Sequence, residues 1–446
     1  MDTPAGVDTR VAHPAVRLPP SPPIPKTVQA LLAVGRWREL AAWLTRRYGG
    51  AFTIHVPIFG TAVVVTDPWL VKQVFLADPA DLGVLRLNQI SRLVGMGSVF
   101  ALNGAAHRRR RDLLGPSLHG KRLRGHQPML IEETLAEAAG WPDGAEFETY
   151  APMLRITFNA ILHAVFGAAG AEFDELRRVV PPMVKLGSRL VMLPKPARTY
   201  GRFTPWGRLA RWRVRYEAVV DELIAQVRTD PNAAERTDVL AVLVRSGLSR
   251  TEIGDELFGL AAAGHETTAA TLSWIFERIS RQPQLLAELA AEADAGGNAL
   301  RRATIREVQR TRSTSGFTGR YVYAPVFRLG EWVIPRGCVI RVAIGQVHRN
   351  TDAFPDPDRF DPHRFLTGSP SAFEWIPFGG GTRHCPGSAF ASLAMDVVLR
   401  TVLRHFTIEP TTAPPEKWHY RGVTYTPKRG GRIVVYRRSL SSPDPG

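Results

Sequence analysis

Apolar residues recur at helical spacing over most of this 446-residue chain, which predicts several long helices. The clearest is an apolar segment that begins after Ser249, where Glu252 completes a capping box typical of a helix N-terminus. Residues 179–206 contain V-V-P-P-M, M-L-P-K-P-A and F-T-P-W and are expected to be irregular, because proline interrupts a helix. Further helices are predicted at residues 27–48, 68–75, 150–166 and 208–228.

Strand-like runs are short and few. Residues 52–66, F-T-I-H-V-P-I-F-G-T-A-V-V-V-T, predict a strand pair with its turn near residues 57–60. Three runs between residues 319 and 350 predict strands and a turn, and residues 422–431, G-V-T-Y-T-P-K-R-G-G, predict a hairpin near the C-terminus. We therefore expect a mainly α protein with a small β region.

The chain shows no internal repeats, and its composition changes only at the two ends. Residues 18–25, L-P-P-S-P-P-I-P, cannot form a helix and predict an extended segment on the surface. We expect residues 1–26 to form a proline-rich lead-in, residues 27–438 to form a single domain and residues 439–446 to form a tail.

The charge balance is strongly basic, with 57 Lys and Arg against 41 Asp and Glu and a formal net charge of +16. Such a balance affects solubility and the choice of partners rather than the fold. No nucleic-acid-binding motif accompanies it, so we expect no nucleic acid partner. No apolar run approaches the ~20 residues of a membrane span and no signal peptide pattern is present, which predicts a cytoplasmic protein.

The chain has only two cysteines, Cys338 and Cys385, which excludes a disulfide framework and favours a reducing compartment. Cys338 lies in a strand-like run and is expected to be a buried apolar residue. Cys385 follows three glycines, Gly379 to Gly381, and precedes a helical pattern that starts at Ser388. A cysteine just before a helix N-terminus favours the thiolate, and a single thiolate suits haem iron better than a zinc or iron–sulfur site.

The segment around Cys385 resembles a known family. F-G-G-G-T-R-H-C-P-G, residues 378–387, matches the F-x-x-G-x-R-x-C-x-G haem-thiolate loop of the cytochrome P-450 monooxygenases. The resemblance implies the cytochrome P-450 fold, a haem b cofactor with Cys385 as iron ligand, and cofactor contacts from Phe378, Arg383 and Gly387. The alternative from this stretch alone is a glycine-rich turn with a structural cysteine.

A polar break interrupts the long apolar helix at A-G-H-E-T-T, residues 263–268. A glycine and a charged glutamate are costly there, which predicts a local opening of the helix with Thr267 bonding inward. The sequence is similar to the A/G-G-x-D/E-T-T signature of the same family, which places Ala263 and Gly264 beside the haem. It also implies that Thr267 steadies iron-bound dioxygen while Glu266 relays protons. The alternative is a kink packed against another helix.

The run H-R-R-R-R-D-L-L, residues 107–114, places His107 and Arg111 four residues apart on one helix face. Haem propionates require paired donors, and the resemblance assigns this role to His107, Arg111 and Arg320. Without that assignment the run would be a solvated helix face, which is our expectation for residues 108–110.

The resemblance also implies a structural ionic cluster of Glu307, Arg310 and Arg359 that supports the cysteine loop. A proline that the family carries after the E-x-x-R helix is missing here. T-R-S-T-S-G, residues 311–316, stands in its place, so the resemblance does not predict the backbone of residues 313–318.

The predicted function is a monomeric haem-thiolate monooxygenase that inserts one oxygen atom from O2 into an apolar small molecule. Electrons would come from a separate ferredoxin-type donor with its reductase, which would dock on a basic patch formed by Arg108, Arg109, Arg110, Lys121, Arg122 and Arg124. The turn of the C-terminal hairpin is expected to reach the substrate. Two alternatives remain open, a peroxide-driven hydroxylase and a haem-binding sensor without turnover.

Overall fold

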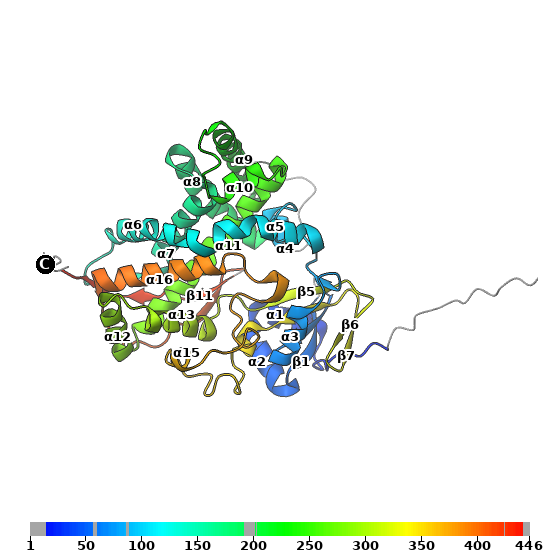
Figure 1. The fold of residues 1–446 in the computed structure, drawn as a ribbon. Coiled ribbons are helices and arrows are strands. Elements are labelled where there is room, and N and C mark those ends of the chain that lie inside the picture. Colours follow the sequence, from blue (N-terminus) through cyan, green and yellow to red (C-terminus); the bar gives the residue numbers. More distant parts are fainter. Residues whose placement is uncertain are drawn as a thin grey trace, which may run out of the picture.

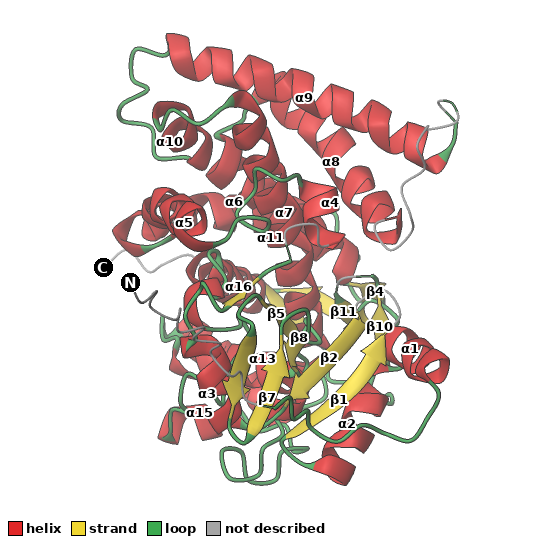
Figure 2. Ribbon diagram, turned by 90° about the vertical axis from the view of Figure 1, so that its right-hand side faces the viewer, coloured by secondary structure: helices red, strands yellow, loops and turns green. Residues whose placement is uncertain are grey.

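The computed structural model describes residues 15–56, 60–85, 89–190, 201, 203–422 and 424–439. Helices dominate these residues, and the strands gather at one side of the molecule (Figures 1 and 2). The expectation of a mainly α protein with a small β region is confirmed.

The helices surround one central element, α11, which crosses the middle of the molecule (Figure 1). In chain order they are α1 (Lys26–Gly35), α2 (Trp37–Tyr48), α3 (Pro68–Leu76), α4 (Gln89–Val94), α5 (Gly104–Leu118), the 3-10 helix η1 (Gly120–His126), α6 (Gln127–Ala138), α7 (Tyr150–Ile161), the π-helix η2 (Leu162–Phe166), α8 (Gly170–Leu190), α9 (Pro205–Thr229), α10 (Val239–Arg245), α11 (Arg250–Ile279), α12 (Pro283–Asp294), α13 (Ala299–Thr311), α14 (Ile344–Val347), α15 (Arg364–Thr367), the 3-10 turn η3 (Gly381–Arg383) and α16 (Ser388–His405).

The strands of the described residues form one five-stranded sheet and four strand pairs. They are β1 (Ala51–Val56), β2 (Gly60–Val65), β3 (Leu82–Gly83), β4 (Phe147–Glu148), β5 (Thr318–Val322), β6 (Val326–Leu329), β7 (Trp332–Pro335), β8 (Val339–Val342), β9 (Phe406–Ile408), β10 (Trp418–Tyr420), β11 (Tyr425–Pro427), β12 (Arg432–Ile433) and β13 (Val435–Arg437). The sheet has the order β1-β2-β8-β5-β3, with β2 and β8 parallel and its other neighbours antiparallel.

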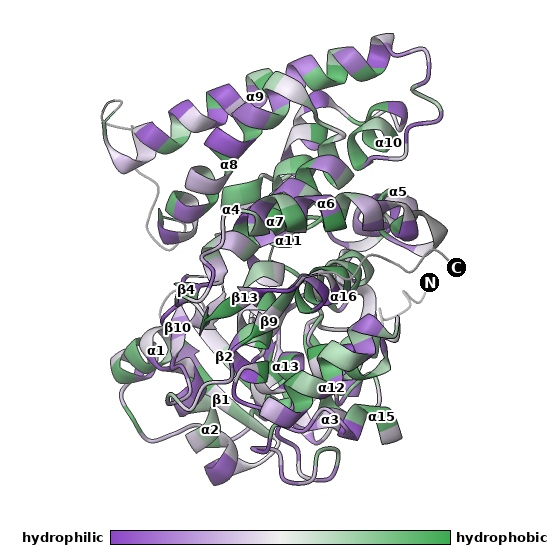
Figure 3. Cartoon of the chain, turned by 90° about the vertical axis from the view of Figure 1, so that its left-hand side faces the viewer, coloured by the Kyte–Doolittle hydropathy of each residue, from purple (hydrophilic) through white to green (hydrophobic). Residues whose placement is uncertain are grey.

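The central helix α11 is stabilised by an N-terminal capping box and by the burial of most of its side chains. Ser249 accepts the backbone N–H of Glu252, whose carboxylate accepts the N–H of Ser249, so the predicted capping box is confirmed. Most of the helix is buried, including the polar side chains of Asp255, Glu256 and His265, as expected for a helix at the centre of a large protein. The peripheral helix α9, in contrast, has long hydrophilic stretches (Figure 3). α11 is therefore the rigid support on which a site can be built.

Two helix predictions need correction. Residues 27–48 form two helices instead of one, because Arg36 leaves the helical conformation at φ −138° and ψ 43°. Residues 179–190 are not irregular, since α8 continues through Pro181 and Pro182. A proline inside a helix costs about 3 kcal/mol. The apolar face of α8 outweighs this cost, since each buried aliphatic side chain contributes about 1.5–3 kcal/mol, and it includes Leu176, Val179, Val180, Met183 and Val184. Residues 191–200 and 202 lie outside the described part.

The proline-rich segment and the first strands agree with the sequence. Residues 15–25 contain no helix, and the N–H and the hydroxyl of Thr53 in β1 donate to the carbonyls of Pro20 and Pro19 at 2.8 Å each. The predicted strand pair is β1 with β2, although its turn at residues 57–59 lies outside the described residues. Within the described part of the chain, no helix is long and apolar enough to cross a membrane.

Candidate functional site

A cavity of about 450 Å³ lies between α11 and the loop that precedes α16. Its walls are largely apolar and include Phe100, Ile161, Val165, Leu260 and Phe317. Every predicted site residue except Glu266 lines it, namely His107, Arg111, Ala263, Gly264, Thr267, Arg320, Phe378, Arg383, Cys385 and Gly387. The folding of the chain thus brings together residues that are up to 280 positions apart in the sequence.

The loop before Cys385 is shaped by glycines that pack against α3. Gly379 and Gly381 have φ values of 68° and 63°, a region that side chains disfavour. A Cβ on Gly380 would lie 2.1 Å from the ring of Phe75, and one on Gly381 would lie 2.0 Å from the Phe75 carbonyl oxygen. Gly380 and Gly381 therefore let the loop approach α3 closely, and the loop presents Cys385 to the cavity.

The surroundings of Cys385 act on the pKa of its thiol in two directions. Burial raises the pKa of the Cys385 thiol, whereas the N–H of Gly387 and the charge of Arg111 act in the opposite direction. The helix N-terminus alone therefore does not keep this thiol ionised. Coordination to a metal ion would ionise it, because a ligating thiol gives up its proton.

One end of the cavity is basic, and we call it the basic end: His107, Arg111, Arg320 and Arg383. Arg111 donates to the carbonyl of His384 at 2.7 Å, and Arg320 donates to the carbonyl of Gly380 at 2.9 Å. Arg383 donates to the side-chain oxygen of Asn103 at 2.6 Å. Among the described residues, none of these arginines has a carboxylate partner and no Asp or Glu lines the cavity.

The basic end carries an electrostatic cost. Burial, followed by the charges of Arg383, Arg111 and Arg320, lowers the pKa of His107 to about 3. Burial also lowers the pKa of Arg320 and Arg383 to about 10, and each of these shifts includes repulsion from a neighbouring arginine. Carboxylates placed here would remove that repulsion. Together with the apolar walls and the thiol, this chemistry fits haem, which is flat and apolar and carries two propionates and a metal ion.

The α11 wall of the cavity contains Ala263, Gly264 and Thr267. The helix is continuous over Arg250–Ile279, so the predicted opening at the polar break is not observed. The hydroxyl of Thr267 donates to the carbonyl of Ala263 at 2.9 Å, and that of Thr268 donates to Gly264 at 2.9 Å. These hydrogen bonds place both hydroxyl hydrogens within the helix, which leaves the Thr267 oxygen as an acceptor toward the cavity.

Glu266 lies on a different face of α11, toward α7 and the β10–β11 turn. Tyr150 donates its hydroxyl to Glu266 Oε1 at 3.4 Å, and the Arg421 guanidinium lies 4.5 Å from the centre of the Tyr150 ring. Burial raises the pKa of the Glu266 carboxyl, while contacts with Thr424 and Tyr150 and the charge of Arg421 oppose the shift. Sequence reasoning missed Tyr150 and Arg421, because nothing in the chain links positions so far apart.

The hairpin predicted over residues 422–431 is not observed among the described residues, because β11 pairs with the preceding strand β10 through a turn at residues 421–424, and β12 pairs with β4. No described residue of these two strands or of their turn lines the cavity. Val423 lies outside the described residues. The expectation that a turn of this segment reaches a substrate stays a prediction, whereas residues of the 421–424 turn are observed beside Glu266.

The predicted ionic cluster of Glu307, Arg310 and Arg359 is wrong in one member, Arg359. Arg310 pairs with Glu307 at 2.7 Å, but the side chain of Arg359 is 68% exposed and does not reach Glu307. Arg364 occupies that place, with its Nε 3.4 Å from Glu307 Oε1, while Arg359 offers only its carbonyl to Arg310. The sequence contained a hint of this second candidate arginine, because P-D-R-F is followed five residues later by P-H-R-F at residues 362–365.

The expected solvated face of residues 108–110 is wrong for Arg110. Its side chain is 3% exposed and pairs with Glu256 at 2.7 Å and with Glu252 at 3.0 Å, both on α11. Arg108 and Arg109 are exposed, as expected. Arg110 therefore cannot belong to a docking patch for an electron donor.

Comparison with known proteins agrees with this arrangement. The family model described as cytochrome P-450 matches residues 19–433. The chain is 57% identical over 433 residues to a Mycobacterium tuberculosis protein named "Putative cytochrome P-450 138", with 96% of this chain and 98% of that protein covered. It is 35% identical to "Putative cytochrome P-450 135B1" of the same species, with 94% and 91% covered.

The fold comparison gives the same answer at lower sequence identity. The retinoic acid bound structure of cyanobacterial CYP120A1 superposes with a TM-score of 0.81 at 21% identity and covers 95% of this chain and 100% of that one. This likeness concerns the fold, whereas the family match rests on the sequence. The chain belongs to the cytochrome P-450 family and is an oxidoreductase of the haem-thiolate monooxygenase type.

Proposed function

We propose that this protein uses haem b to insert one oxygen atom from O2 into an apolar small molecule. The observation that carries the proposal is the composition of one cavity, which combines a thiol, a basic end without carboxylates and otherwise apolar walls. Cavities of several hundred Å³ with apolar walls and few polar groups are typical of sites for small molecules. The 450 Å³ cavity matches that description.

The basic end and the thiol give the cofactor its orientation. His107, Arg111, Arg320 and Arg383 would hold the two propionates, and Cys385 would bind the iron. Bound haem supplies dioxygen binding and two-electron activation, which a thiolate ligand favours by donating electron density. The protein supplies binding, orientation and protons.

Thr267 and Glu266 divide the handling of protons between two faces of α11. The Thr267 hydroxyl donates to Ala263, so its oxygen would accept a hydrogen bond from a water in the cavity and hold that water in place. Glu266 lies outside the cavity lining and beside Tyr150, whose neighbour Arg421 is exposed to solvent. Glu266 therefore takes a proton from the solvent side and passes it toward Thr267 through water or by rotating its side chain.

Electrons come from a separate carrier, which we infer to be an acidic ferredoxin served by its own reductase. The exposed side chains of Arg108 and Arg109 extend from α5, the helix whose His107 and Arg111 line the cavity. A basic patch on this helix steers an acidic protein to a place near the haem edge. The two free cysteines fit a reducing, cytoplasmic setting.

Isotope labelling tests the function. The haem-loaded protein is supplied with ferredoxin, reductase, ¹⁸O2 and catalase, together with a compound that shifts its Soret band. The proposal predicts a product that carries one ¹⁸O atom. A product that forms only with added peroxide, without label from ¹⁸O2, would instead identify a peroxide-driven hydroxylase. A spectral shift without any product would identify a sensor.

A further inference from the structure

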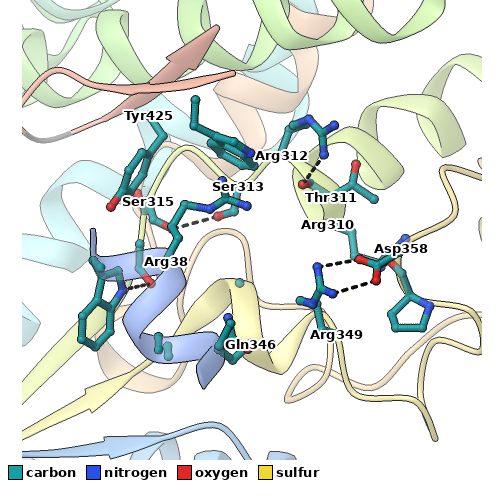
Figure 4. Close-up of a pocket in the computed structure, with 18 residues that line it drawn as sticks. Arg38, Arg310, Thr311, Arg312, Ser313, Ser315, Gln346, Arg349, Asp358 and Tyr425 are labelled. Atoms are coloured by element: carbon teal, nitrogen blue, oxygen red, sulfur yellow. Dashed lines mark hydrogen bonds and ion pairs between the residues drawn. The ribbon is translucent and has the colours of Figure 1, made fainter. Parts of the chain in front are cut away.

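A second pocket, of about 130 Å³, lies between α2 and the segment that follows α13 (Figure 4). Four arginines line it, and they come from three parts of the chain: Arg38 from α2, Arg310 and Arg312 from the end of α13 and the residue after it, and Arg349 from the loop after α14. Asp358 is the one acidic residue among the described residues that line it. The pocket is thus far more basic than its single carboxylate can balance.

Two of the four arginines already have carboxylate partners. Arg310 pairs with buried Glu307, and Arg349 pairs with Asp358 at 2.6 Å (Figure 4). Arg38 and Arg312 have no ion-pair partner among the described residues. Arg38 lies 3.4 Å from the centre of the Trp418 ring, and Arg312 lies 5.5 Å from the same centre.

Arg312 is also short of hydrogen-bond acceptors. One terminal nitrogen donates to the carbonyl of Thr311 at 3.0 Å, but its buried Nε has no acceptor. A buried donor without an acceptor costs about 1–3 kcal/mol. An acceptor that comes within hydrogen-bond distance of this Nε would recover that energy.

Burial and neighbouring positive charges also disfavour the charged forms of Arg38 and Arg312. Burial lowers the pKa of Arg38 to about 10, with Arg349 adding to the shift and Glu39 and Tyr425 opposing it. Burial likewise lowers the pKa of Arg312 to about 10, and the charges of Arg278, Arg38 and Arg281 add to the shift while Glu277 opposes it. Both groups remain cationic at neutral pH, so an anion between them would be strongly favoured.

We propose that this pocket binds a small oxyanion of the phosphate type between Arg38 and Arg312. Paired guanidinium groups are the donors that phosphate and carboxylate oxygens prefer. A cavity needs about 10–15 Å³ to hold one water molecule, so the 130 Å³ pocket has room for a small oxyanion. Ser313, Ser315 and Gln346 line the same space and add polar contacts for the remaining oxygens (Figure 4).

The pocket shares a wall with the large cavity. Ser313 and Ser315 line both, and they belong to the T-R-S-T-S-G segment that departs from the family pattern. The segment is tied from outside the cavity, because Trp37 donates to the carbonyl of Gly316 at 3.4 Å and Tyr425 donates its N–H to the carbonyl of Thr314 at 2.9 Å. An anion that fixes Arg312 would also fix this wall, so oxyanion binding and ligand binding in the large cavity are coupled.

Phosphate titration tests the site. Tryptophan fluorescence of the haem-loaded protein is followed while inorganic phosphate replaces chloride at constant ionic strength. The wild type should show saturable binding, and Arg38→Gln and Arg312→Gln should each weaken it by about tenfold or more, as expected for a lost charge-assisted hydrogen bond. Arg46→Gln, which removes an exposed arginine of the same helix α2, should bind phosphate as the wild type does.

Three results would overturn the site: no saturable binding in the wild type, equal affinities in all four proteins, or equal responses to phosphate and chloride. Circular dichroism identifies a misfolded variant, and Arg38→Gln alone decides the matter if Arg312→Gln does not fold. Phenyl phosphate is titrated in parallel. A higher affinity than that of inorganic phosphate identifies a phosphate ester as the natural ligand, and a lower affinity identifies the free ion.

Coupling is measured with 4-phenylimidazole, which binds haem iron and shifts the Soret band. Its affinity should change by about fivefold or more when phosphate saturates the second pocket, since coupling between sites is typically of this size. The change should be absent in Arg38→Gln. An affinity that phosphate leaves unchanged in the wild type would show that the shared wall does not connect the two sites.

Discussion

Arg110 and Arg111 are neighbours in α5, yet they lie in opposite electrostatic surroundings. Arg110 is buried against α11 and pairs with Glu252 and Glu256. Arg111 lines the cavity and meets the carbonyl of His384 but no carboxylate. The charge of Arg110 is neutralised by two carboxylates of the chain itself, whereas Arg111 has no carboxylate partner among the described residues.

The difference separates structural charges from ligand-binding charges. A buried arginine whose carboxylate is supplied by the chain holds two helices together. At the basic end three arginines lie close to one another and to His107, and none of the described residues that line the cavity supplies a carboxylate, so an anionic ligand would complete the arrangement. The same criterion distinguishes Arg310, which pairs with Glu307, from Arg38 and Arg312 in the second pocket.

The largest effect is expected at Arg110. Arg110→Gln leaves Glu256 buried without its partner, and breaking a buried ion pair in this way costs about 3–5 kcal/mol. Urea unfolding of the apoprotein measures the loss. Arg109→Gln, the exposed neighbour, should change the free energy of unfolding by less than about 0.5 kcal/mol. Equal stabilities of the two variants would show that the α5–α11 contact is not structural.

Glu266 is expected to affect the rate rather than the stability. Glu266→Gln should slow turnover by about 10²-fold, the usual contribution of a general acid or base. Thr267→Ala should still accept electrons but should divert them to hydrogen peroxide. Stopped-flow kinetics and peroxide assays measure both effects. Wild-type turnover and coupling in both variants would contradict these roles.

The pH dependence sharpens the assignment of Glu266. Its pKa is raised by burial, and only the protonated acid can donate, so turnover should fall as pH rises through that raised pKa. Arg421 opposes the rise, so Arg421→Gln should raise the pKa further and move this fall to higher pH. Lys428→Gln, an exposed change in the same region, should leave the profile unchanged. A profile that does not move in Arg421→Gln would separate Arg421 from the proton route.

A smaller effect is expected at the basic end. Arg111→Gln and Arg320→Gln should each speed haem loss by about tenfold, because each would remove the charge-assisted hydrogen bond that we propose to a propionate. The stability of the apoprotein should hardly change, in contrast to Arg110→Gln. Haem transfer to an excess of apomyoglobin measures the rate. If both variants retain haem as the wild type does, the basic end is not the carboxylate site.

The smallest effect is expected from the exposed arginines. The buried position of Arg110 removes it from the predicted docking patch, and the side chains of Lys121 and Arg122 lie outside the described part. Combined Arg108→Gln, Arg109→Gln and Arg124→Gln should slow reduction by an acidic ferredoxin about threefold at low salt, and screening at physiological salt should remove most of the difference. Reduction rates that respond neither to salt nor to these changes would place the partner elsewhere.

Local rules predicted much of the fold. The capping box at Ser249 and Glu252 and the cap of α3 by Asp67 depend on residues a few positions apart, and both are observed. The path of α8 through Pro181 and Pro182 was not predictable, because it depends on burial against distant helices.

The candidate site was predicted as a set of residues and not as an arrangement. Motif spacing identified residues that line the cavity and separated Arg111 from Arg110, but it placed Arg110 on a solvated face instead of against α11. Successive helix positions point about 100° apart, so only the packing of α5 on α11 decides what Arg110 contacts. The sequence analysis assigned Arg359 to Glu307, because local sequence does not distinguish its P-x-R-F copy from the one that carries Arg364. The contact between Glu266 and Tyr150 spans 116 positions.

The reduced, CO-bound spectrum of the haem-loaded protein tests the central claim most directly, because it reports the iron ligand itself. The wild type and Cys338→Ala should both show the red-shifted Soret band of thiolate ligation, since Cys338 is buried next to β8 and does not line the cavity. Cys385→Ala should lose that band. A red-shifted band that survives in Cys385→Ala, or that disappears in Cys338→Ala alone, would contradict the account.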